Sequence, residues 1–258
     1  MTSRTVRISD SSGAGLEPSP RIISSRKGTA LFGPSGRHGT RLGSSLRIKE
    51  LEDQLTALQT SLICSFNQLL DLRDLNTGVH STRLAEWAVQ VAGEVGLKDE
   101  VALSDIEIAA LLHDIGKIGI PDSVLHKPAK LTHEEHELMK KHPEYGWAVL
   151  QKIPGMERAS LLVLHHHESY DGRGYPGGLE GEEIPIGSRI VSVIDAFDAM
   201  VSFRPYRQGL PPQEAERRLL EASGRQFDSA IVKSFLPIAR AEMSAVFAAA
   251  GTSVSAIL

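Results

Sequence analysis

The segment at residues 165–176, with the sequence HHHESYDGRGYP, constrains the fold of this chain more than any other feature. It places imidazoles and carboxylates beside a loop whose glycines let the backbone approach a ligand. Two related groups lie far away in the sequence, His113-Asp114 with Lys117 upstream and Asp195 downstream. Gathering such side chains in a fold is costly without a metal ion or charge partners. The pattern therefore indicates a metal site beside a phosphate-binding site, and predicts a metal-dependent hydrolase of a phosphorylated substrate.

The composition is typical of a soluble chain that can bury a core: of 258 residues, 41% are hydrophobic and 23% charged. A net charge of -4 gives no overall basic surface, so a nucleic acid polymer is not an expected partner. The single cysteine, Cys64, cannot form an internal disulfide, which favours a reducing compartment. We find neither a membrane-spanning apolar run nor a secretory signal, so we predict a cytoplasmic protein without a membrane partner.

The N-terminal part of the sequence changes character at Leu46. Residues 1–45 are rich in Ser, Gly and Arg, and their few large apolar side chains predict a disordered tail. Because the tail is locally basic, an anionic partner is an alternative to a merely solvated tail.

An amphipathic helix is predicted over residues 46–75. Its leucines repeat in a 4-3-4 spacing, and Phe66 and Leu69 continue the same face; the leucines are Leu51, Leu55, Leu58 and Leu62. About two heptads of this pattern leave two interpretations open. The helix either packs on its own domain, or it forms a homodimer through residues 46–70 or relays a signal from a partner protein.

The remaining sequence is predicted to be helical almost throughout. Capping boxes begin helices at Ser104 and Thr132, and Gly116 is placed to end the first of them. No segment alternates as a strand would, so the fold class is all-α. We expect helices over 83–95, 104–114, 132–142, 156–168, 189–202, 212–222 and 229–241, a loop over 169–188, a catalytic domain over 76–245 and a C-terminal tail over 246–258.

The motifs occur in the order and spacing of the HD-GYP family, a branch of the HD phosphohydrolases, which this chain resembles over roughly residues 65–240. The first motif is His113-Asp114 with Gly116-Lys117, and the second begins at His142-Pro143. The third joins His166-His167-Glu168 to the Gly-Tyr-Pro loop at residues 174–176. The resemblance implies an HD-type helical bundle that hydrolyses cyclic di-GMP to pGpG, or on to GMP after a second cut.

The resemblance also implies the roles of individual residues. Two divalent metal ions, iron or manganese, would share a bridging hydroxide, and Asp114 would bridge both ions. The first ion would be held by His80, His113, Asp114 and Asp195, and the second by His142, His166 and His167. Lys117 would act beside Asp114 in catalysis and would bind phosphate together with Arg204. Tyr175 and Arg173 would contact the substrate from the loop.

Departures from the family pattern leave alternatives. Asn76 stands where some members carry a glutamate for a third metal, so we expect two metals and question degradation to GMP. An HD hydrolase of another cyclic dinucleotide or nucleotide is one alternative, and a module that only binds cyclic di-GMP or a protein is the other. The presence of all seven expected ligands favours the enzyme.

Overall fold

The computed structural model describes residues 39–74, 79–202 and 208–255, and it divides the chain into two units, residues 1–50 and 51–258. The described part of the first unit is the beginning of α1 (Gly39–Asp74). The predicted tail lies outside the described residues up to position 38, and the predicted helix at 46–75 begins earlier, at Gly39.

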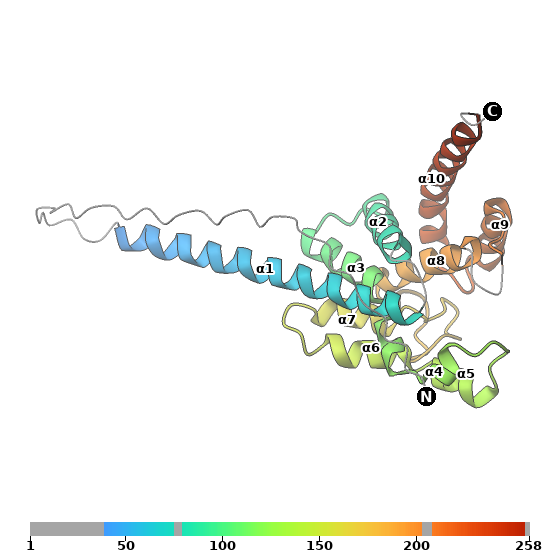
Figure 1. Cartoon of the computed structure of the whole chain (residues 1–258), viewed down its shortest axis with the longest axis horizontal. Helices are drawn as coiled ribbons and strands as arrows, with labels where there is room; N and C mark the ends of the chain where they lie inside the picture. The colour runs from blue at the N-terminus through green and yellow to red at the C-terminus, as the bar shows by residue number, and fades with distance from the viewer. Residues whose placement is uncertain (1–38, 75–78, 203–207, 256–258) are drawn as a thin grey trace, which may run out of the picture. The chain divides into compact units, whose positions relative to one another are not determined.

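Helices make up the second unit (Figure 1), and the described residues include no strand, only two isolated β-bridges. The all-α prediction is therefore confirmed. The elements are α2 (Val79–Glu94), α3 (Glu100–Leu112), η1 (Ile115–Gly119), α4 (Asp122–Leu125), α5 (His133–Met139), α6 (His142–Leu150), α7 (Glu157–Leu164), η2 (Gly181–Glu183), α8 (Ile186–Val201), α9 (Pro212–Ala222) and α10 (Ser229–Ser255).

The core lies where α2 meets α3, α8 and α10. Trp87 is fully buried there, and its ring makes edge contacts with Phe197 of α8 and Phe235 of α10 at centroid distances of 5.9 and 5.3 Å. The indole nitrogen of Trp87 donates to Glu242, so the polar atom of this core residue is satisfied. This packing holds α8 and its acidic residues against α2 and α3.

Several predicted helix ends are wrong, for identifiable reasons. Asp99, rather than Ser104, caps α3, and its side chain accepts the backbone N–H of Val101. Gly116 does not end α3, which stops at Leu112; it lies inside η1. A polar residue followed three positions later by an acid also occurs inside helices, so the capping-box pattern alone cannot locate a start.

The capping box at Thr132 is confirmed, but its helix ends at Met139, and His142 begins the next helix with Pro143 in its first turn. Likewise, α7 ends at Leu164 rather than at 168. The C-terminal helix continues past the predicted end at 241, and the tail predicted for 246–258 is helical as far as Ser255. None of the described helices combines the length and apolarity needed to span a membrane.

Candidate metal centre

Three histidines of the site stand at or just past the C-terminal end of a helical segment. His113 is the C-cap of α3, His142 follows α5 at the start of α6, and His166 follows α7. In each, the ring Nδ1 lies within hydrogen-bonding distance of the carbonyl three residues earlier, at 2.9 Å for Ala110, 2.9 Å for Met139 and 2.6 Å for Val163. The last carbonyls of a helix have no partner within it, so they are available to fix these rings.

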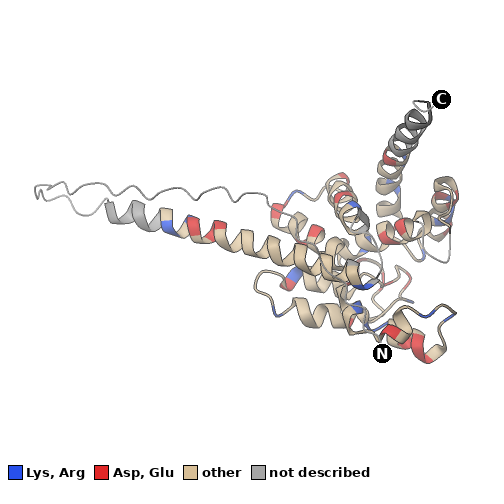
Figure 2. Ribbon diagram, in the orientation of Figure 1, with Lys and Arg blue, Asp and Glu red and all other residues tan. Residues whose placement is uncertain are grey.

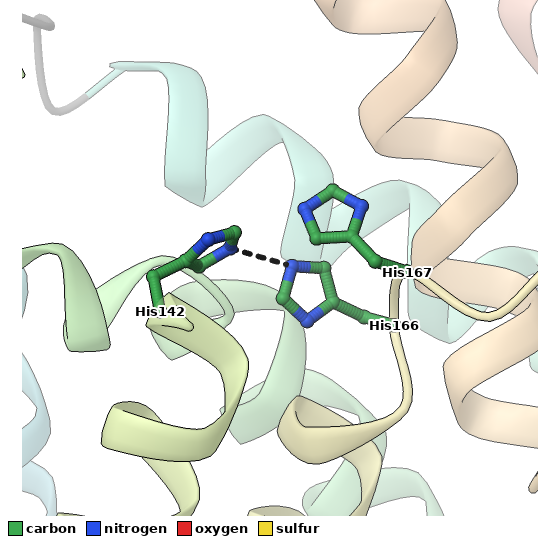
Figure 3. A group of neighbouring side chains, drawn as sticks. All are labelled: His142, His166 and His167. Atoms are coloured by element: carbon green, nitrogen blue, oxygen red, sulfur yellow. Dashed lines mark hydrogen bonds between the residues drawn. The ribbon is translucent and has the colours of Figure 1, made fainter. Parts of the chain in front are cut away.

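This arrangement turns the Nε2 atoms of the rings toward the interior of the site. A protonated Nδ1 that donates to a carbonyl places the lone pair on Nε2, the tautomer that binds a metal. Figure 3 shows His142, His166 and His167 turned toward one another, with Nε2 of His142 3.3 Å from Nε2 of His166. One ligand atom from each of the three lies within 4.8 Å of the others, the spacing of a metal site.

Burial keeps the three clustered imidazoles neutral. It lowers the pKa of His142 and holds that of His166 well below the usual range. Burial, followed by the neighbouring His142, lowers the pKa of His167 to about 4. Three neutral nitrogens pointing at one position, with no thiolate among them, form a donor set that suits a divalent transition metal. The residues present therefore fit the expected cofactor.

A carboxylate face adjoins the three imidazoles. Asp114 lies between two histidines: its Oδ2 is 3.3 Å from Nε2 of His113, and its Oδ1 is 3.3 Å from Nε2 of His142. Asp195, from α8, places Oδ1 3.7 Å from the same nitrogen of His113. Asp114 thus faces both groups of predicted ligands.

The electrostatics of this face favour a cation. Burial alone would lower the pKa of His113, but the carboxylates of Asp114 and Asp195 raise it to about 9. Burial would raise the pKa of Asp114, yet Lys117, His113 and His142 hold it well below its usual value. The two carboxylates therefore stabilise positive charge at this position, and a metal ion can supply that charge in place of the histidine proton.

Lys117 is held close to Asp114 by the course of η1. Its Nζ lies 2.7 Å from Oδ2 of Asp114, and its side chain is 18% exposed. Gly116 lets η1 pass α6, because a Cβ there would lie 1.8 Å from the carbonyl oxygen of His142. Arg73, in the last turn of α1, donates to the carbonyls of Ile118 and Ile120 at 2.6 and 2.5 Å. These contacts place a partly exposed ammonium group at the edge of the cluster.

The loop after α7 covers the cluster with Tyr175. The phenol ring stacks on His167 at a centroid distance of 5.0 Å, and the backbone N–H of Tyr175 donates to the carbonyl of His167 at 3.2 Å. Burial, then the charges of Asp114 and Asp195, raises the pKa of this phenol above its usual value. Tyr175 therefore remains a hydrogen-bond donor at the mouth of the cluster.

Glu168 fixes this loop from inside. Its side chain is fully buried and accepts the backbone N–H groups of Gly177 at 2.7 Å and Leu179 at 3.2 Å. His165 lies 3.3 Å from the same carboxylate and is not part of the three-histidine cluster. Gly174 passes so near the backbone of Glu168 that an added Cβ would lie 2.4 Å from its Cα. The loop is thus held by hydrogen bonds from its backbone N–H groups to the Glu168 carboxylate, and by the close approach of Gly174 to the backbone of Glu168.

A second set of contacts joins the helices that carry the outer site residues. Arg83 of α2 donates to Asp198 of α8 and, at 3.0 Å, to the hydroxyl of Ser202. The Ser202 hydroxyl in turn donates to Asp198 at 2.9 Å, and the carboxylate of Asp198 is fully buried. This network holds the end of α8, near Asp195, against α2.

The structure brings together most, but not all, of the residues that the sequence singled out. The group that meets within the described residues consists of His113, Asp114, Lys117, His142, His166, His167, Tyr175 and Asp195. Arg173 is 87% exposed, with its Nε 3.9 Å from Asp171. The structure does not describe the side chain of His80, and Asn76 and Arg204 lie outside the described residues.

Sequence reasoning missed how the loop and the helices are fixed. It did not identify the groups that Glu168 and Asp198 contact. A histidine at or just past a helix end, with an apolar residue three positions earlier, is a usable signal for a ring oriented by a carbonyl. No comparable signal exists for Glu168, since its partners are backbone N–H groups nine and eleven residues later.

Comparison with known proteins agrees with this geometry. A sequence model described as an HD domain matches residues 65–231. A cyclic di-GMP phosphodiesterase of Thermotoga maritima is 44% identical over 174 residues, which cover 67% of this chain and 47% of the relative. A 3'3'-cGAMP-specific phosphodiesterase 2 of Vibrio cholerae is 37% identical over 177 residues, covering 68% of this chain and 34% of the relative.

A solved structure of a Bdellovibrio bacteriovorus protein described as an HDG"Y"P protein shares the fold, with a TM-score of 0.50 and 22% sequence identity. The similarity covers 62% of this chain and 51% of that chain. The similarity thus spans about a third to a half of the length of these three proteins.

Proposed function

Because the chain belongs to the HD domain family, in its HD-GYP branch, we propose that it is a metal-dependent phosphodiesterase that hydrolyses cyclic di-GMP to pGpG. The observation that carries the proposal is the convergence of three neutral imidazoles beside a carboxylate pair and a lysine. That arrangement supplies ligands for divalent metal ions and a cation for phosphate in one place.

The proposed ligands divide into two groups that share Asp114. One group is His80, His113, Asp114 and Asp195, and the other is His142, His166 and His167, with iron or manganese as the expected metals. Bound metal ions would polarise the phosphodiester and lower the pKa of water enough to supply a nucleophile near neutral pH. The contacts of Asp114 to both His113 and His142 support its place between the two groups.

The protein's own side chains would bind and orient the substrate. Lys117 would offer its ammonium group to a phosphate oxygen, exchanging part of its interaction with Asp114, and Arg204 would bind a second oxygen. Tyr175, kept protonated, would donate a hydrogen bond from above His167. Arg173 is proposed to contact the substrate at the outer rim, in keeping with its exposed side chain.

A test is turnover of cyclic di-GMP by protein purified without oxygen and loaded with iron or manganese. Asp114→Ala should lose activity by at least about 100-fold, since a ligand common to both metals is removed. Asp105→Ala is a matched control. Like Asp114, Asp105 has a little-exposed carboxylate, but it lies in α3 and pairs with Arg158. Activity that survives in Asp114→Ala would contradict the proposal.

The same assay decides the alternatives. The relative that is specific for 3'3'-cGAMP makes that dinucleotide the second substrate to test, under identical conditions. Chromatography separates pGpG from GMP, and pGpG as the end product would support two metals with Asn76 as a non-ligand. Metal-loaded protein that binds the dinucleotides without turnover would favour a binding module.

Three predictions concern the surroundings of the enzyme. We propose a cytoplasmic location, where cyclic di-GMP would be the substrate, and signalling proteins as partners that act through residues 46–70. The same helix is the proposed homodimer interface. Fractionation of cells tests the location. Affinity capture with and without residues 39–70 tests the signalling partners.

A further inference from the structure

Helix α1 presents two different apolar faces. One face packs on the domain through Ile63, Phe66 and Leu70, and its polar members Gln59 and Arg73 bond to the backbone of residues 154 and 118. At about 100° per residue, the leucines of the 4-3 pattern lie roughly 100° around the helix from this docking face. Packing on the domain therefore leaves most of the leucine face exposed, with Leu62 half-buried.

The leucine face is longer and more exposed than the 4-3-4 spacing alone indicates. It continues in steps of three and four from Ile48 to Leu72, with Ser65 as its one polar member. The exposed fractions are 57% for Ile48, 50% for Leu51, 54% for Leu55, 58% for Leu58, 53% for Leu69 and 79% for Leu72. We call these residues, with Leu62 and Ser65, the seam.

The seam lacks the charges that a solvated helix face usually carries. Residues 54–70, which are 17 in number, contain no lysine, arginine, aspartate or glutamate. Figure 2 shows this part of α1 as an unbroken tan run. Exposed apolar stripes of this length on a soluble domain mark an interaction surface, and a 3.5-residue period is the pattern by which one helix pairs with another.

We infer that the seam pairs with the seam of a second copy of this chain as a parallel, in-register two-stranded coiled coil. In heptad terms Ile48, Leu55, Leu62 and Leu69 occupy a, and Leu51, Leu58, Ser65 and Leu72 occupy d. The flanking charges are compatible with this arrangement: Arg47 at g, which bonds to Glu50 of its own helix at 2.9 Å in the single chain, would also lie near Glu52 at e of the other copy. Both symmetry-related pairs are attractive, which favours the parallel register.

The docking face and the seam do not compete for the same side chains. The domain contacts b and e positions, so each copy keeps its own domain while a and d meet. The inference concerns assembly and does not depend on which nucleotide, if any, the metal centre hydrolyses.

Disulfide trapping tests both the pairing and its register. In a Cys64→Ser background, Ser65→Cys places a thiol at a d position, where two copies meet. Thr60→Cys is the matched control: it is also exposed, it replaces a hydroxyl that likewise bonds four residues back, and it lies about 180° from the seam. We expect at least ten times more cross-linked dimer from Ser65→Cys under mild oxidation.

The molar mass in solution completes the test. Wild type should have twice the chain mass of 28.0 kDa, and Leu55→Gln with Leu58→Gln should shift it toward the single chain while the far-UV spectrum is kept. Monomeric wild type, equal trapping of the two cysteines, or a dimer that Ser65→Cys does not trap would each overturn the parallel seam.

Discussion

The metal centre and the seam of α1 depart from ordinary burial in opposite directions. At the ends of α3, α5 and α7, histidines that usually stay near solvent are buried, with His166 fully enclosed. Along α1, leucines that are usually enclosed are half exposed. Each departure costs free energy in the isolated chain, and each would be relieved by the binding partner proposed for it.

The two regions differ in how rigidly the chain prepares them for that partner. Each of three histidines is fixed by a hydrogen bond from Nδ1 to a helix-end carbonyl, and Tyr175 is fixed by the loop that Glu168 holds. The seam needs only the regularity of the helix itself. A metal demands a donor geometry set to tenths of an ångström, whereas apolar pairing depends on area and period.

Metal removal should have the largest effect. A chelator should abolish hydrolysis and lower the melting temperature by about 5–10 °C, because metal at a 100-fold excess over its Kd contributes about 2.7 kcal/mol to a domain of this size. Manganese should restore both. In His166→Ala, which loses a fully buried member of the three-histidine cluster but leaves the other ligand group intact, the melting temperature should respond less to manganese than in the wild type. An equal response there would place the stabilising metal elsewhere.

How far the sequence predicted this site depends on the kind of residue. The motif spacing identified His142, His166 and His167 before any geometry, and the structure brings them together. The class of fold followed from the absence of alternating segments, since every predicted element is helical. Local patterns and motif order carry this information directly.

The remainder depends on contacts that no local pattern encodes. The start of α3 at Asp99 and the break at residues 139–142 were mispredicted because caps compete with tertiary packing for the helix ends. The leucines of α1 were recognised as one face, but the prediction that Phe66 continues that face is wrong. Phe66 packs on the domain with Ile63 and Leu70 as part of a second face. Which face a helix buries is decided by its neighbours.

Substitution of Glu168 should have an intermediate effect, and it distinguishes a role in positioning Tyr175 from a role in metal binding. In Glu168→Gln, the buried N–H groups of Gly177 and Leu179 lose their charged acceptor, and Tyr175 is no longer held over His167. We expect kcat/KM to fall by about 10- to 100-fold, corresponding to about 1.5–3 kcal/mol. Metal content, measured by elemental analysis, should stay at the wild-type level.

A double variant shows whether Glu168 acts through the tyrosine. Glu168→Gln with Tyr175→Ala should cost little more than Tyr175→Ala alone, because coupled residues are not additive. Glu183→Gln is the control, since this exposed carboxylate lies on the same loop. Additive losses, or loss of metal in Glu168→Gln, would contradict a positioning role.

The smallest effect separates the two faces of α1. Leu70, on the docking face, is 5% exposed, so Leu70→Ala should lower the free energy of unfolding by about 2–4 kcal/mol at any protein concentration. Leu58, on the seam, is 58% exposed, so Leu58→Ala should change it by less than about 0.5 kcal/mol in dilute protein. In concentrated protein the proposed pairing would cover the seam, and Leu58→Ala should then cost more. Urea unfolding at both concentrations measures the difference. If Leu58→Ala lowers the free energy of unfolding by the same amount at both concentrations, the seam is covered by its own chain.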